Sequence, residues 1–222
     1  MSVEGEFRER LNAVSLYLRA LSDIEKRQLK RKRLFYRVHA TLAASRASAF
    51  IMIYNCVEFA TKDSLNTIRM DAAIKVNTFE ELVDHWQAEI ITNRFAQKLS
   101  NGVNHNSFLE ELRKSIPIKP LDLRNSKSLP FSGNINHEKL IDLAKKIGEK
   151  RWAPPKASLG GSDLELIRNT RNDLAHGAET FENIGSQYAN KDIYDKLVRV
   201  RIFMCSYIRM MERYKSKERY RM

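Results

Sequence analysis

The stretch "RNTRNDLAHG" (residues 168–177) sets several hydrogen-bonding side chains into a segment whose other residues predict a core helix. When the sequence is turned through about 100° per residue, as in an α-helix, the apolar residues gather on one face. They are Leu164, Ile167, Leu174 and Ala178. Ser162 and Glu165 are spaced as a capping box, and Gly177 is a helix-stop residue. The sequence therefore predicts a helix over residues 162–177.

Arg171 falls within the apolar face of this predicted helix, between Ile167 and Leu174. Arginine is rarely buried without a partner, because removing its charge from water is expensive. We therefore expect Arg171 to meet a carboxylate, to line a cleft, or to lie at a subunit interface.

A polar ridge runs beside that apolar face, because Arg168, Asn172 and His176 follow one another at intervals of four residues. Asn169 and Asp173 flank its outer side. Histidine titrates near neutral pH and arginine keeps its charge. Such a pair suits phosphoryl chemistry, in which one group moves protons and the other stabilises developing charge. The competing interpretation is structural, with a histidine that caps the helix and an arginine that forms an ion pair, and spacing alone favours it.

The rest of the chain also predicts helices, from its apolar periodicity and its capping residues. The predicted ranges are 4–33, 37–75, 78–90, 107–116, 133–148 and 191–215. The 222 residues include only 8 Gly and 5 Pro, so turns are few. No segment shows the sustained alternation of a strand. The sequence predicts an all-α fold, with 43% hydrophobic residues to form its core.

We predict one domain over residues 1–222, in which residues 1–36 form a basic N-terminal helix. Residues 116–161 form a loop-rich insertion with a short helix, and residues 162–215 hold the motif helix and the final helix. The formal net charge of +12 favours polyanionic partners.

Two basic clusters are candidate RNA contacts. The first lies near the end of the N-terminal helix and contains Lys30, Arg31, Lys32 and Arg33. A solvated helix end is an equally good interpretation of this cluster. The second cluster covers residues 213–221, in a tail that we expect to fray.

A cytoplasmic location is expected, since the N-terminus lacks an apolar signal region and the longest uncharged run, residues 47–57, is too short to span a bilayer. The two cysteines, Cys56 and Cys205, stand far apart in apolar surroundings and read as buried free thiols.

No metal site and no cofactor are predicted, because no histidine pair has metal-ligand spacing and no carboxylate cluster completes a site. The histidines outside the stretch are His39, His85, His105 and His137. A carboxylate does stand out in the apolar helix over 37–75, where Glu58 shares a helix face with Asn55. A structural hydrogen bond is the first interpretation of Glu58, and support of a functional site is the second.

The run from Arg171 to His176 resembles the signature of the HEPN superfamily: an arginine, a polar residue, three further positions and a histidine. Three longer pieces resemble a branch of HEPN proteins found in prokaryotic toxin–antitoxin and antiviral defence loci. They are "YNCVE" (54–58), "FSGNINHEKLIDLAKKIG" (131–148) and "RNDLAHG…FENIG" (171–185).

The resemblance implies an antiparallel HEPN-like helical bundle with extra short helices and loops, which forms a two-fold homodimer through the motif helix. It also implies a metal-independent endoribonuclease, that is, a nuclease (a hydrolase in the broad sense) that leaves 2′,3′-cyclic phosphate and 5′-OH ends. His176 would move protons, Arg171 would bind the scissile phosphate and stabilise its transition-state charge, and Asn172 would orient His176 or the phosphate. Asp173, Arg168, Glu58 and Asn55 would support the site.

The family also contains RNA-binding or protein-interaction modules without catalysis, and that is the alternative function. An antitoxin or another defence-system protein is an implied partner. Some HEPN toxins carry a tyrosine two residues after the histidine, which a partner nucleotidyltransferase modifies; this chain has Ala178 there. The resemblance therefore does not extend to that partner.

Overall fold

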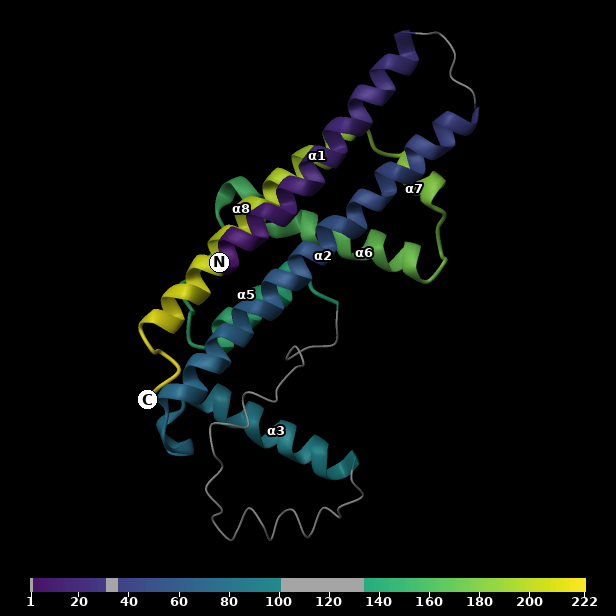
Figure 1. Cartoon of the computed structure of the whole chain (residues 1–222). Coiled ribbons are helices and arrows are strands. Elements are labelled where there is room, and N and C mark those ends of the chain that lie inside the picture. The colour runs from purple at the N-terminus through teal and green to yellow at the C-terminus, as the bar shows by residue number, and fades with distance from the viewer. Residues whose placement is uncertain (1, 31–35, 101–133) are drawn as a thin grey trace. The chain divides into compact units, whose positions relative to one another are not determined.

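The computed structural model of the chain describes residues 2–30, 36–100 and 134–222. In these ranges the regular elements are helices, and the one β-type contact is an isolated bridge between Leu82 and Arg221. The α-helices are α1 (Val3–Lys30), α2 (Tyr36–Lys75), α3 (Asp84–Ser100), α5 (His137–Lys146), α6 (Ser162–Ala175), α7 (Phe181–Ser186) and α8 (Asn190–Ser216). Figure 1 shows these α-helices; two short 3₁₀ helices, η1 (Phe79–Glu81) and η3 (Lys156–Gly161), are the other helical elements in the described ranges. The all-α prediction is confirmed.

Element boundaries differ from the predicted ones where local contacts decide them. Helix α6 begins at Ser162, but the N-cap is Gly161 and no side chain caps the helix, so the predicted capping box does not form. The segment after the motif contains α7, whose N-cap Thr180 accepts a hydrogen bond from Asn183 N. The predicted helix over 78–90 is split into η1 and α3, and the predicted helix over 107–116 lies outside the described residues.

The chain divides into two compact units. The first comprises Met1–Thr61, Asn134–Asp142 and Ala153–Arg209; the second comprises Lys62–Gly133, Leu143–Trp152 and Met210–Met222. The assignment of residues 1–222 to one domain stays a prediction.

Helix α1 runs antiparallel to α8 in the first unit. Near one end of α1, Glu4 accepts two hydrogen bonds from Arg209, at 2.8 and 2.9 Å. Near the other end, Glu25 accepts from Asn190 Nδ2 at 2.7 Å. The apolar stripes of the two helices are buried, as their spacing predicts. These buried side chains include Phe7, Leu11, Leu18, Phe203 and Tyr207.

Helix α6 is held in the first unit by an ion pair at its start. Asp163 is 7% exposed and accepts a hydrogen bond from Arg199 Nε of α8 at 2.5 Å. Lys196 Nζ lies 3.4 Å from the same carboxylate. Leu164 and Ile167 are buried on the face predicted from the sequence. This anchoring fixes the helix that carries the motif.

Helix α7 packs directly on the backbone of α2. A Cβ atom built on Gly185 would lie 1.6 Å from Ala43 O, so glycine is required by the close approach. Arg46 is 6% exposed and donates from Nε to Gly185 O at 2.8 Å. The segment after the motif is therefore tied to α2.

The second unit is organised around buried aromatic side chains. Trp86 of α3 is fully buried and donates from Nε1 to Tyr214 Oη at 2.9 Å. Arg69 of α2 is also buried and pairs with Glu89 at 2.8 Å.

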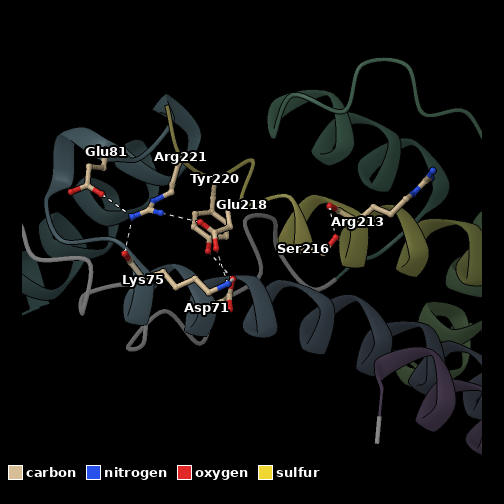
Figure 2. A network of polar contacts seen from close by, with 8 residues as sticks. All are labelled: Asp71, Lys75, Glu81, Arg213, Ser216, Glu218, Tyr220 and Arg221. Atoms are coloured by element: carbon tan, nitrogen blue, oxygen red, sulfur yellow. Dashed lines mark hydrogen bonds and ion pairs between the residues drawn. The ribbon is translucent and has the colours of Figure 1, made fainter.

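The C-terminal segment is docked in the second unit, and the prediction that it frays is wrong. Figure 2 shows Arg221 between Glu81 and Glu218, with Tyr220 reaching Asp71. Tyr220 is fully buried and its hydroxyl donates to Asp71 at 2.7 Å. Backbone bonds from Val83 N to Tyr220 O and from Met222 N to Glu81 O, both 2.9 Å, complete the docking.

The described residues contain a single helix that is long and apolar enough to cross a membrane, Arg37–Lys75 in α2. Within its most apolar window, 56% is buried inside the protein, as in the core helix of a soluble domain.

Candidate functional site

The polar ridge predicted on α6 is present and continues through His176. The backbone N–H of His176 donates to Asn172 O at 2.9 Å, so His176 lies one helical turn after Asn172. His176 is the C-cap residue, and its side chain is exposed. Gly177 then adopts a φ of +70°, which turns the chain away and leaves the imidazole at the open end of the helix.

Arg171 is half-buried and rests on an aromatic ring. Its Cζ lies 5.2 Å from the ring centroid of Tyr54 in α2, and its Nη1 donates to Asn172 Oδ1 at 3.1 Å. Among the described residues, no carboxylate forms an ion pair with it. Of the three surroundings expected for Arg171, a carboxylate partner is not found in the described part of the chain, and a π face and an amide contact the guanidinium instead. A guanidinium has five N–H donors, and one of those of Arg171 bonds to Asn172.

Asn172 connects this arginine to a distant part of the chain. Its Nδ2 donates to Asn134 Oδ1 at 3.1 Å. Asn134 lies just before α5, and the two residues that follow it, Ile135 and Asn136, are held by hydrogen bonds. Ile135 N donates to Tyr54 Oη at 3.1 Å, and Asn136 Oδ1 caps α5 by accepting from Lys139 N at 3.0 Å.

Three stretches quoted from the sequence thus meet at one place. "YNCVE" supplies Tyr54, the segment that leads into α5 supplies Asn134, and the motif supplies Arg171 and Asn172. Sequence reasoning quoted the first two stretches but did not single out Tyr54 or Asn134. Only the contacts between segments distinguish these two residues from their neighbours.

The predicted supporting residues lie around this cluster with their own contacts. Arg168 bonds along α6 to Glu165 and Asn169, at 3.2 and 2.8 Å. Asp173 is exposed, and its backbone oxygen accepts from Ala178 N at 2.9 Å. On α2, Asn55 is exposed and Glu58 is half-buried. Their roles in a site stay predictions, as do those of Arg171, Asn172 and His176.

The first basic cluster cannot be placed, because Arg31, Lys32 and Arg33 lie outside the described residues and Lys30 is described only as the last residue of α1. In the second cluster, Arg219 pairs with Glu149, and Arg221 pairs with Glu81 and Glu218. Those two arginines hold the C-terminal segment in place.

A basic hollow of about 600 Å³ lies in the second unit, between the start of α3, the end of α5 and the C-terminal segment. Its cationic lining residues are Lys145, Lys146, Lys150 and Arg219. His85 also lines it, and burial, followed by the charges of Lys146 and Arg69, lowers the pKa of this histidine in spite of nearby Glu89. Among the described residues, no three His, Cys, Asp or Glu side chains are grouped so that they could hold a metal ion.

Residues 2–220 match the model of the family described as HEPN_MAE_28990-like HEPN. No curated protein and no solved structure matches the chain.

Proposed function

The chain belongs to the HEPN superfamily, and on that premise we propose that it is a metal-independent endoribonuclease that acts as a toxin or antiviral defence effector in the cytoplasm. Family membership supports a nuclease or another RNA-related role. The observation that carries the finer proposal is the arrangement of Arg171. Its guanidinium is held by Tyr54 and Asn172, with no neutralising carboxylate among the residues that the structure describes, beside a ridge that ends in the exposed His176.

In the proposed reaction, the ribose 2′-oxygen attacks the adjacent phosphorus while the bond from phosphorus to the 5′-oxygen breaks. His176 accepts the proton of the 2′-OH or donates one to the leaving 5′-oxygen. Arg171 stabilises the extra negative charge on the phosphoryl oxygens in the transition state. Asn172 orients the guanidinium. The products are a 2′,3′-cyclic phosphate and a 5′-OH.

A two-fold homodimer through α6 belongs to the same proposal. One imidazole cannot be base and acid in the same step, and a dimer supplies two copies of His176, one for each proton transfer. It also places two copies of Arg171 near one phosphate, which suits an arginine on a mostly apolar helix face. An antitoxin or another defence protein that covers this surface would hold the activity in check.

The test is cleavage of total RNA and transfer RNA in the presence of EDTA, by the wild type, His176→Ala and Arg171→Ala. His39→Ala is the matched control, because His39 is also an exposed histidine on a helix. We expect the wild type and His39→Ala to leave cyclic phosphate ends, and the two motif variants to lose about 10²-fold or more of the rate.

Each other outcome has a definite meaning. Equal cleavage by all four proteins would identify a contaminating nuclease. Loss of cleavage on adding EDTA would replace the proposal with a metal-dependent nuclease. RNA binding without cleavage by any variant would favour the non-catalytic HEPN module.

A further inference from the structure

The side-chain amide of Asn172 is held in one orientation by a hydrogen-bond donor on one side and an acceptor on the other. Its oxygen accepts from Arg171 Nη1 and its nitrogen donates to Asn134 Oδ1, both at 3.1 Å. Exchanging the oxygen and nitrogen of Asn172 would place an N–H against a guanidinium N–H, which repel. The guanidinium, which has only donors, therefore sets which edge of Asn172 faces it, and the oxygen of Asn134 accepts from the opposite edge and holds the amide in that place.

Asn134 is exposed, but the backbone that carries it is fixed. The following residue, Ile135, is 1% exposed and its N–H bonds to the Tyr54 hydroxyl; the next, Asn136, is 3% exposed and caps α5. The ring of the same Tyr54 lies under the Arg171 guanidinium. One tyrosine thus supports both ends of the chain of contacts that runs from Arg171 through Asn172 to Asn134.

We propose that Asn134 and Tyr54 are positioning residues of the Arg171 site. Asn134 fixes Asn172, Asn172 fixes the rotation of the guanidinium, and Tyr54 fixes its plane and the backbone before Asn134. Arg171 is then presented to a phosphate in one orientation before RNA binds. The proposal rests on the proposed function for its catalytic consequence, but the fixed guanidinium is a property of the free protein.

The first experiment measures kcat and KM on a fluorogenic RNA oligonucleotide that the wild type cleaves. In Asn134→Ala we expect kcat to fall about 10- to 100-fold with little change in KM, because misplacement of a group by ~1 Å costs rates of this order. The melting temperature should stay unchanged, since the lost side chain is exposed. Asn66→Ala is the matched control: Asn66 is also exposed and accepts from an arginine, Arg69, at 3.0 Å.

Two further variants separate positioning from direct contact with RNA. Asn134→Asp keeps the oxygen that accepts from Asn172 but adds a negative charge, so we expect a kcat near that of the wild type and a raised KM. In an Asn172→Ala background, Asn134→Ala should have no further effect, because its route to Arg171 is already broken. An additive effect, or an unchanged kcat in the single variant, would overturn the proposal.

A second readout needs no cleavage. Rotation of the Arg171 guanidinium, followed by the ¹⁵N signals of its side chain, should be slow in the wild type and faster in Asn134→Ala. In Tyr54→Phe, which keeps the ring and loses only the hydroxyl, rotation should be accelerated less. If the wild type cleaves no RNA while the rotation responds as expected, the proposed function fails and the positioning roles stand. If the rotation is the same in all variants, the positioning roles are refuted whatever the activity.

Discussion

Replacement of Gly185 by alanine should destabilise the protein strongly, although it improves the helix propensity of α7. The added methyl would lie 1.6 Å from Ala43 O and 2.4 Å from Ala43 C, and both atoms belong to the backbone of α2. Ordinary contact begins near 3.4 Å, so α7 must move away from α2 by well over an ångström. A rotamer change cannot relieve the contact.

The displacement also breaks the hydrogen bond between Arg46 Nε and Gly185 O, which is 2.8 Å long and buried. Overpacking costs about 1–3 kcal/mol, and loss of a buried hydrogen bond to a charged group costs about 1.5–3 kcal/mol. The free energy of unfolding should therefore fall by about 3–5 kcal/mol. For a chain of this size, that corresponds to a melting temperature lower by about 6–20 °C.

The assay is thermal unfolding followed by circular dichroism, with urea unfolding as a second measure. Ser186→Ala is the control, since it changes the neighbouring exposed residue of the same helix and should shift stability by no more than about 0.5 kcal/mol. The sign of the change in melting temperature decides between two explanations. Alanine exceeds glycine in helix propensity by about 1 kcal/mol, so a helix α7 that did not pack on α2 would be stabilised by Gly185→Ala. An unchanged or higher melting temperature would refute the packing argument.

Three further predictions concern the motif helix and the second unit. Arg171→Lys keeps the charge but loses the planar guanidinium that rests on Tyr54. The rate of RNA cleavage should therefore fall about 10- to 100-fold, a smaller loss than in Arg171→Ala. Equal cleavage rates of Arg171→Lys and the wild type would contradict this. Asp163→Asn removes the buried partner of Arg199 and Lys196. It should lower the free energy of unfolding, measured by urea unfolding, by about 2–3 kcal/mol, which is below the cost for a fully buried pair because both cations are partly exposed. A change under about 0.5 kcal/mol would argue against this ion pair as the anchor of α6. Burial lowers the pKa of His85 from its ordinary value of 6.5. As the pH falls through 6.5, the unfolded state therefore binds more protons than the folded state, and the free energy of unfolding decreases towards pH 5. In urea unfolding at pH 7, 6 and 5, His85→Gln should lose less of this free energy than the wild type, and parallel pH profiles of the two proteins would exclude His85 as a cause.

The helices could be predicted from the sequence because apolar periodicity is a local property. Phe7, Leu11 and Leu18 are each no more than 2% exposed, as the stripe in the N-terminal helix predicts. The face of α6 followed from the same rule. The motif ridge was also predictable, since Asn172 and His176 depend only on the helical repeat.

Contacts between distant segments could not be predicted in this way. Nothing local to Asn134 indicates that it will accept a hydrogen bond from Asn172, 38 residues later. The C-terminal segment is a second example: its basic residues suggested a fraying tail, yet Tyr220 is fully buried and Arg221 is paired. Aromatic residues among the basic ones were the available signal, because a solvated tail does not require them.

Among the described residues Arg171 has no carboxylate partner, and this is as informative as the contacts that it does make. A carboxylate about 4 Å away would hold the guanidinium with ~4 kcal/mol at an effective dielectric constant of ~20, and an incoming phosphate would have to compete with that attraction. A tyrosine ring and an amide oxygen restrain the same side chain without cancelling its charge. The arrangement therefore combines a fixed orientation with an available positive charge, which is what stabilisation of a phosphoryl transition state requires. An ion pair with a carboxylate would have supplied the fixed orientation but not the available positive charge.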